Sequence, residues 1–259
     1  MRHFFFFVKQ QALSCLFPVA VFTLLALSHF ASSVIYRYDF MLIGCIVVQI
    51  LLVRLKIETV DELKVICVFH LLGLLMELFK VHFGSWAYPE PAITKFWGVP
   101  LYSGFMYASV ASYMCQAWRR LNLRLYNWPQ HWIARVIGAL IYINFFSNHF
   151  MPDVRYLVAL LIVFFFRKAG VQFHIENKTC RMPVILSFLL TGFFIWLAEN
   201  VATRLGAWKY AYQHNTWTIV DYHKISSWAF LVIVSFIIIT ELKTLKNQIE
   251  QGEGSKAGA

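Results

Sequence analysis

The sequence has few charged residues. Only 14% of its 259 residues are Asp, Glu, Lys or Arg, whereas 59% are hydrophobic and 18% are aromatic. Soluble domains carry charge at nearer a quarter of their positions, so this chain lacks the residues that would cover a water-facing surface. Long apolar runs take their place. The runs are continuous rather than alternating, which excludes a transmembrane β-barrel and favours membrane-spanning helices.

The motifs of common nucleotide-binding and hydrolytic enzymes are also missing. The chain contains no Walker loop, dinucleotide-binding fingerprint, zincin motif or nucleophile elbow. Its five cysteines form no disulfide framework, because four lie in apolar runs and Cys180 lies in a segment expected to face the reducing cytoplasm. The sequence therefore leaves any cofactor unassigned.

The apolar runs predict an all-α integral membrane protein with eight transmembrane helices. The expected spans are approximately residues 12–30, 39–54, 63–82, 97–117, 132–149, 154–167, 183–203 and 218–241. A single transmembrane domain would cover residues 1–242, and residues 243–259 would form a polar cytoplasmic tail. No small-residue cleavage site follows the first run, so we expect a retained helix and not a signal peptide.

Lysine and arginine are distributed unevenly between alternate loops. If the N-terminus is cytoplasmic, sixteen of the 23 Lys and Arg residues fall on the cytoplasmic side, as the positive-inside rule requires. Both termini are then predicted to be cytoplasmic. This topology accounts for the net charge of +10. The chain has no basic stripe with interleaved aromatic residues, so we expect membrane lipids as partners and no nucleic acid. The sequence gives no oligomeric state.

Two stretches of the chain are similar at an offset of 122 residues. Each consists of a Glu, six further residues and then Gly-x-Trp-x-Tyr. The two copies are Glu77, Gly84, Trp86 and Tyr88, and Glu199, Gly206, Trp208 and Tyr210. The same offset lays the first span on the fifth and the fourth on the eighth. We therefore predict two parallel four-helix repeats, about 10–120 and 130–242, around an axis near the membrane normal.

Glu77 and Glu199 are the main candidate catalytic residues. Each lies about one turn inside the outer end of its span, where an unpaired carboxylate costs a few kcal/mol and usually faces the bundle interior. At related positions, the two carboxyls would face one cavity and could act as general acid and base. The structural alternative is a pair of helix-end ion pairs, Glu77 with Lys80 and Glu199 with Arg204.

The remaining candidates are weaker. Candidate substrate-binding residues are Trp86, Tyr88, Trp208, Tyr210, Lys80 and Arg204, although aromatic residues at helix ends are also typical of interfacial belts. His70 precedes Glu77 by seven residues on one helix face and is either a proton-relay residue or a core histidine. No metal site is predicted. The weak candidate ligands, whose spacings are not diagnostic, are His149, Asp153, Asp221 and His223.

Three segments resemble a known family. They are Met76-Glu-Leu-Phe-Lys-Val-His-Phe-Gly-Ser-Trp-Ala-Tyr-Pro-Glu-Pro91, Val99-Pro-Leu-Tyr-Ser-Gly-Phe-Met-Tyr-Ala-Ser-Val-Ala-Ser-Tyr113 and Ile195-Trp-Leu-Ala-Glu-Asn200. They look like the YoaT-like bacterial membrane family, domain of unknown function 817. The resemblance extends from Gln11 to about Lys243. It implies a multi-pass protein of the bacterial inner (plasma) membrane and no established activity.

A second resemblance covers about 25 residues in each half. A helix-end carboxylate, Gly-x-Trp-x-Tyr and then Val99-Pro100 are similar to membrane carotenoid cyclases and hydratases, which act on polyisoprenoids. After Pro100 the chain reads Leu-Tyr-Ser, without the paired carboxylates of such cyclases, and Asp221-Tyr222 stands where the second half would carry Val-Pro. The resemblance therefore implies a lipophilic substrate and not the cyclisation itself.

These observations favour an intramembrane enzyme or binding protein for a lipophilic molecule, an isoprenoid or a lipid, reached from the outer leaflet. The glutamates would be its acid and base. One alternative is a small-molecule or ion transporter that uses the same carboxylates as proton carriers, although clearly broken spans of the transporter type are missing. Another is a structural or regulatory membrane partner protein.

Overall fold

The computed structural model describes residues 2–213 and 215–257, with side chains described as far as residue 244. Its α-helices are α1 (Arg2–Ser14), α2 (Leu16–Ala31), α3 (Arg37–Arg54), α4 (Val60–His82), α5 (Gly104–Arg120), α6 (His131–Ser147), α7 (Arg155–Phe166), α8 (Val184–Arg204) and α9 (Lys224–Ala257). Two 3-10 turns are η1 (Leu101–Ser103) and η2 (Ala211–Gln213). The last two residues of the predicted polar tail lie outside the described part.

Each predicted span contains a helix, but the helices differ in their capacity to cross a membrane. Three are long and apolar enough, namely α4, α8 and residues Lys224–Thr244 of α9. A fourth span results if α1 and α2, which are bent by 58° at Cys15, are counted together. Helix α7 has 12 residues, so it is only about 18 Å long, less than the roughly 30 Å of hydrocarbon. Three to four spans follow from length and composition, and the full set of eight stays a prediction.

The protein is mostly helical, as predicted, but two small antiparallel sheets that were not predicted accompany the helices. Strands β1 (Lys95–Phe96) and β2 (Val99–Pro100) form a hairpin whose turn, Trp97-Gly98, has positive φ at both residues. Strands β3 (Arg124–Tyr126), β4 (Gly170–Ile175) and β5 (Lys178–Pro183) form the second sheet. These segments are too short to register as apolar runs. In β4 apolar and polar residues alternate, and Val171 and Ile175 are buried. This alternation was the signal in the sequence that was missed.

The helices pack in pairs that recur in the two halves of the chain. Helix α2 packs on α3 and on α5, and α6 packs on α7 and on α9. The closest pairs are α4 with α5 and α8 with α9, and α5 meets α9 between the halves. A Cβ atom at Gly192 would lie only 2.8 Å from the backbone nitrogen of Ala229, so this glycine permits the close approach of α8 to α9.

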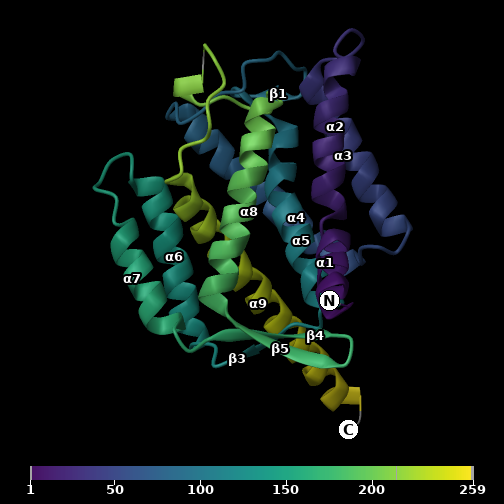
Figure 1. Cartoon of the computed structure of the whole chain (residues 1–259), viewed down its shortest axis with the longest axis vertical. Helices are drawn as coiled ribbons and strands as arrows, with labels where there is room; N and C mark the ends of the chain where they lie inside the picture. The colour runs from purple at the N-terminus through teal and green to yellow at the C-terminus, as the bar shows by residue number, and fades with distance from the viewer. Residues whose placement is uncertain (1, 214, 258–259) are drawn as a thin grey trace.

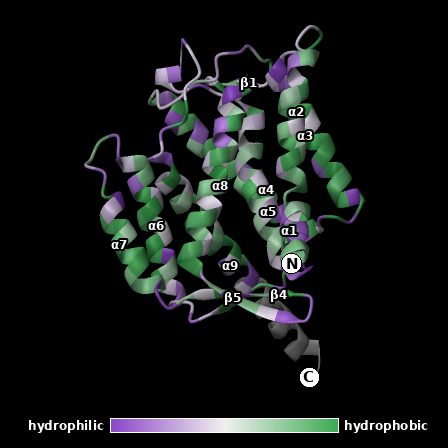
Figure 2. Cartoon of the chain, viewed as in Figure 1, coloured by the Kyte–Doolittle hydropathy of each residue, from purple (hydrophilic) through white to green (hydrophobic). Residues whose placement is uncertain are grey.

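The loops lie at two ends of the helical body (Figure 1). The β1–β2 hairpin and the segment after α8 lie at the upper end, and the β3–β5 sheet and the C-terminus lie at the lower end. Apolar residues cover the helices between them, and hydrophilic residues concentrate in the loops (Figure 2). The Gly-x-Trp-x-Tyr stretches, which follow α4 and α8, are therefore at the same end of the molecule.

Candidate functional site

A cavity of about 800 Å³ lies among α1, α2, α5, α8 and α9. Its walls are almost entirely apolar. Among the lining residues, Phe4 of α1 is 66% exposed and Phe194 of α8 is 64% exposed, which places the opening between these two helices. The cavity therefore opens sideways, through the apolar surface of the helical body.

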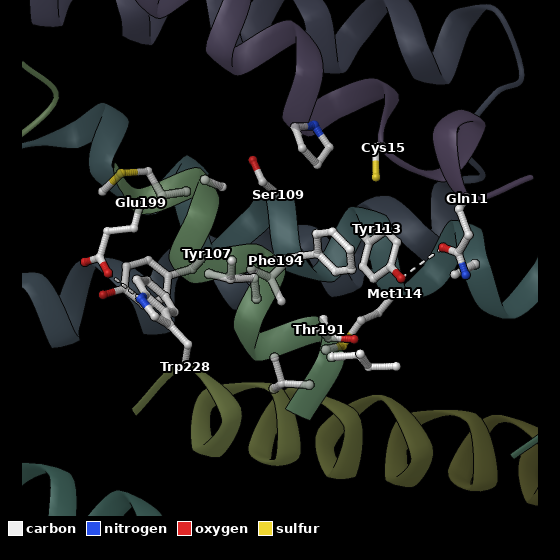
Figure 3. A pocket seen from close by; sticks show the side chains of 18 of the residues that line it. Gln11, Cys15, Tyr107, Ser109, Tyr113, Met114, Thr191, Phe194, Glu199 and Trp228 are labelled. Carbon is white, nitrogen blue, oxygen red and sulfur yellow. Dashed lines mark hydrogen bonds between the residues drawn. The ribbon is translucent and has the colours of Figure 1, made fainter. Parts of the chain in front are cut away.

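Polar groups occur near both ends of this cavity (Figure 3). At one end are Glu77 and Glu199, which are only 2% and 3% exposed. At the other end Tyr113 OH donates to Gln11 Oε1 at 3.0 Å. Tyr113 follows Tyr107, which contacts Glu77, by six residues on α5, so these two positions are about 9 Å apart along this helix, and the lining continues past Tyr113 to Leu121 and Leu123.

Glu77 accepts three hydrogen bonds, all from aromatic side chains. Trp86 Nε1 and Tyr88 OH donate to Oε2 at 2.7 and 2.8 Å. Tyr107 OH donates to Oε1 at 2.8 Å. Both carboxyl oxygens are therefore fixed by neutral donors in a buried position, an arrangement that satisfies a carboxylate without an ion pair.

Glu199 is held in the same manner by fewer donors. Tyr210 OH donates to Oε1 at 2.5 Å and Trp228 Nε1 donates to Oε2 at 2.6 Å. Burial first, and then the adjacent glutamate, raise the pKa of Tyr88 and of Tyr210 well above its ordinary value. Both tyrosines therefore stay protonated and remain hydrogen-bond donors at physiological pH.

The two Gly-x-Trp-x-Tyr stretches contact each other. Ala87 and Lys209 form an antiparallel backbone bridge, in which each N–H donates to the other residue's carbonyl at 2.9 Å. The Trp86 ring lies edge-on to the Tyr210 ring, with 6.0 Å between centroids. The bridged residues are 122 positions apart, which is the offset of the sequence similarity.

The helix ends before the two stretches have the same geometry. Gly84 and Gly206 have φ angles of +68° and +74°, the left-handed conformation of a helix C-terminal cap. The matching backbone bonds run from Ser85 N to Lys80 O at 2.9 Å and from Ala207 N to Ala202 O at 3.0 Å. The two caps orient Trp86, Tyr88, Trp208 and Tyr210 toward the bundle.

The predicted ion pairs do not form in the part of the chain that the structure describes. Lys80 Nζ donates to Phe145 O at 2.7 Å and to Asn148 Oδ1 at 3.1 Å, and so fastens α4 to the end of α6. The guanidinium of Arg204 lies 5.1 Å from the Trp217 ring centroid. The two glutamates have aromatic donors in place of these cations.

His70 and Trp208 have different positions relative to the cavity. The His70 ring packs on Phe105, with 4.4 Å between centroids, and its Nδ1 has no hydrogen-bond partner among the described residues. His70 is not on the cavity wall, so the structure does not bring it to the glutamates. Trp208 is 7% exposed and does line the cavity.

The four weak metal candidates lie apart. His149 Nε2 is 3.0 Å from Lys80 Nζ, and Asp221 Oδ1 accepts a bond from the backbone N–H of His223. Asp153 belongs to the turn between α6 and α7. Within residues 2–213 and 215–257, no group of three His, Cys, Asp or Glu side chains is arranged to hold a metal ion. The geometry assigns no cofactor.

Two residues of the site were missed in the sequence. Tyr107 lies well inside an apolar run, where a tyrosine hydroxyl needs a buried partner, and this was an available signal. Trp228 lies near the outer end of the last run, where it could not be distinguished from an interfacial belt residue. Each of them contacts a glutamate.

A smaller cavity of about 220 Å³ lies beside the first. The residues that line both cavities are Trp86, Tyr107, Glu199, Tyr210 and Trp228. Its other walls come mainly from α4, α6 and α9. The Glu199 side chain and its donors therefore form a partition between an apolar cavity and a more polar one.

The fold and the site define a mostly helical protein, with three to four helices capable of spanning a membrane and an internal apolar cavity that ends at two carboxyls. The family described as protein of unknown function (DUF817) matches residues 3–236. The chain is 52% identical over 240 residues to the uncharacterized protein YoaT of Bacillus subtilis (strain 168), covering 92% of this chain and 91% of that protein. The chain belongs to this family, which confirms the first resemblance. No solved structure matches it.

Proposed function

We propose that this protein is an eight-span membrane protein that takes a lipophilic molecule from the bilayer and places it against Glu77 and Glu199 for proton transfer. The observation that carries this proposal is the apolar cavity of about 800 Å³, which opens sideways and ends at the two buried carboxyls. Its volume lies within the range of cavities that enclose small ligands, roughly 300–1,000 Å³. A ligand that fills it is mostly hydrocarbon.

The parallel repeat supports a shared role for the two carboxyls. Each Glu lies seven residues before a glycine with positive φ that ends its helix. Each Glu also accepts a hydrogen bond from the Tyr eleven positions later. Ala87 and Lys209, which are equivalent in the two halves, pair with each other across the interface. In the proposed arrangement, a two-fold axis relates the two halves, and one ligand contacts both Glu77 and Glu199.

The proposed chemistry is proton transfer to and from carbon or oxygen of the ligand. One carboxyl, protonated, donates its proton, and the other, ionised, accepts a proton from a second atom of the ligand. The pair of carboxyls gives one proton to the ligand and takes one proton from it. A double-bond migration in an isoprenoid chain therefore needs no further reactant. Fixed aromatic donors hold both carboxyls in place for this exchange.

Ligand retention tests the proposal. Ala198→Phe places a bulky side chain in the cavity beside Glu199, since Ala198 lines it, whereas Ala139→Phe is a matched control on the exposed face of α6. Mass spectrometry of organic extracts from the purified proteins should find a lipophilic compound in the wild type and the control, and at least about tenfold less of it in Ala198→Phe. Equal amounts in all three proteins, or none in the wild type, would refute the proposal.

A transporter is the second candidate, and the partition between the two cavities favours it. Glu199 lines both cavities, so a movement of its partners Tyr210 and Trp228 would expose the carboxyl to alternate sides. Proton-coupled uptake by liposomes that contain the wild type, lost in Glu199→Gln, would support this function. Chemical conversion of the retained compound by the wild type would support the enzyme.

A further inference from the structure

The smaller cavity has a positively charged lining. Lys80 from α4, Arg155 from α7 and Lys224 from α9 all line it, together with His149. Glu199 is the carboxylate on its wall, and both oxygens of Glu199 are already bonded to Tyr210 and Trp228. Cations therefore exceed anions around this space.

Lys224 is the cation with spare donors. Its Nζ lies 4.7 Å from the Tyr210 ring centroid and 5.5 Å from that of Trp86. No side chain or carbonyl of the described residues accepts a hydrogen bond from this ammonium, which has three N–H groups. The two rings, one from each Gly-x-Trp-x-Tyr stretch, hold the charge in place at the cavity wall.

The neighbouring polar groups add to this site. Lys80 is 4% exposed and has only neutral acceptors. Arg155 is paired with Asp153 through Nε and Nη2, at 2.6 Å in each case, while Nη1 reaches toward Ser226 at 3.5 Å. Helix α9 begins at Lys224, and the positive end of its dipole favours an anion at the same point.

We infer that the smaller cavity binds a phosphate group, with Lys224 as its principal ligand. A volume of about 220 Å³ is below the range for whole small-molecule ligands and suits a small ion or the headgroup of a larger molecule. Lys224 can donate to an oxygen of a tetrahedral oxyanion, and Lys80 and Arg155 add positive charge to the same wall. The phosphate is either free in solution or the headgroup of an amphiphile whose chain reaches the apolar cavity.

Calorimetric titration of the purified full-length protein in a non-ionic detergent tests the site. The probes are inorganic phosphate, decyl phosphate and, for comparison, decanol. The variants are Lys224→Met, which removes the charge, Lys224→Arg, which keeps it, and Lys209→Met, which removes a charge in the outer loop away from the cavity. Circular dichroism and gel filtration establish that each variant is folded.

The wild type, Lys209→Met and Lys224→Arg should bind phosphate, and Lys224→Met should bind it at least about tenfold more weakly, as expected for the loss of a hydrogen bond to a charged group. Tighter binding of decyl phosphate than of inorganic phosphate, with no similar gain for decanol, identifies a lipid headgroup. Equal binding of the two phosphates identifies the free ion. Absence of phosphate binding by the wild type, or unchanged binding by a folded Lys224→Met protein, overturns the inference. Neither result bears on the lipophilic ligand, which is tested separately through Ala198.

Discussion

At the scale of single residues, the arrangement around Glu77 shows how a carboxyl is accommodated in an apolar protein. Trp86, Tyr88 and Tyr107 donate hydrogen bonds to it, and each of these donors is amphipathic, so its ring adds to the apolar core. The carboxyl and its donors depend on one another. Removal of the acceptor leaves three donors without a partner.

This dependence predicts the effects of substitution. Glu77→Leu should lower the free energy of unfolding by at least about 2 kcal/mol, because each buried donor left unsatisfied costs about 1–3 kcal/mol. Glu77→Gln keeps one acceptor oxygen and should cost less. Denaturant titrations in mild detergent measure the differences. Equal stability of Glu77→Leu and the wild type would show that the three donors have other partners.

Asp153 predicts a pH dependence. Burial acts to raise the pKa of its carboxyl, but hydrogen bonds from Asn144 and from the Arg155 backbone and side chain outweigh it and hold the pKa below the ordinary value of 3.8. The ionised form therefore stabilises the fold above that value, and the stabilisation is lost as the pH falls through the lower native pKa.

Asp153→Asn provides the measurement. Thermal unfolding followed by circular dichroism should show the wild type more stable than the variant at neutral pH. The difference should shrink below about pH 4, where the unfolded carboxyl begins to be protonated. A difference that is constant from neutral pH to about pH 3 would contradict the assignment of the stabilising charge to Asp153.

The sequence located the two glutamates and three of their five hydrogen-bond donors, but not Tyr107 and Trp228. Their spacing from the aromatic residues could be read directly, because the Tyr that bonds each Glu belongs to the repeated stretch. Tyr107 and Trp228 come from other helices, and only the packing of α4 on α5 and of α8 on α9 brings them near. Lys80 and Arg204 were assigned to the glutamates because they are close in the chain, but their side chains leave the helices in other directions.

At the scale of elements, the C-terminal ends of α4 and α8, which precede the two aromatic stretches, require a left-handed backbone conformation. Gly84 and Gly206 both have positive φ, where a residue with a Cβ is strained by about 1–2 kcal/mol. Their surroundings differ. A Cβ at Gly84 would meet nothing within 4 Å, whereas at Gly206 it would lie 3.2 Å from Arg37 Nη1.

Gly84→Ala should therefore destabilise the protein by about 1 kcal/mol, which reflects the backbone alone. Gly206→Ala should cost more, since Arg37 also bonds Ser28 Oγ and the Leu205 carbonyl and would have to move. Urea or thermal unfolding of both variants measures which substitution destabilises the protein more. Asn at either position should cost less than Ala, because Asn tolerates the left-handed conformation. A smaller effect at Gly206 than at Gly84 would contradict this account.

The positions of the helices were predictable from the sequence, whereas the pairing of the strands was not. Apolar runs indicate helices because a long helix needs apolar side chains along its whole length. This pattern can be recognised without knowing which elements pack against the helix. The bend between α1 and α2 and the shortness of α7 depend on tertiary packing. The β3 strand joins β4 and β5 from a distant part of the chain, and no local pattern specifies that pairing.

At the scale of the whole molecule, the two ends of the helical body differ in composition. The β1–β2 hairpin and the segment after α8 lie at one end, and the β3–β5 sheet lies at the other (Figure 1). The aromatic stretches follow α4 and α8 at the first of these ends, and their Trp86 and Tyr210 line the smaller cavity. That sheet carries Arg124, Lys178 and Arg181, which are expected to be cytoplasmic under the positive-inside rule. The end with the aromatic stretches is then predicted to be the outer one.

Accessibility of introduced cysteines tests this orientation, in a background without the five native cysteines. Val34, at 91% exposure, and Tyr222, at 68%, lie in loops of the predicted outer end, one in each half of the repeat. Leu55, at 66%, lies in the loop between α3 and α4, which is predicted to be inner. Lys178, also exposed, is its counterpart in the second half.

A membrane-impermeant maleimide applied to intact cells should label Val34→Cys and Tyr222→Cys. It should label Leu55→Cys and Lys178→Cys only after the membrane is permeabilised. In the eight-span topology four spans separate Leu55 from Lys178 and six separate Val34 from Tyr222, so the two positions of each pair must give the same answer if the repeat is parallel. Labelling of Tyr222→Cys from the inside alone, with Val34→Cys labelled from outside, would mean an odd number of spans between them. The two glutamates would then lie near opposite faces of the membrane and could not act on one ligand.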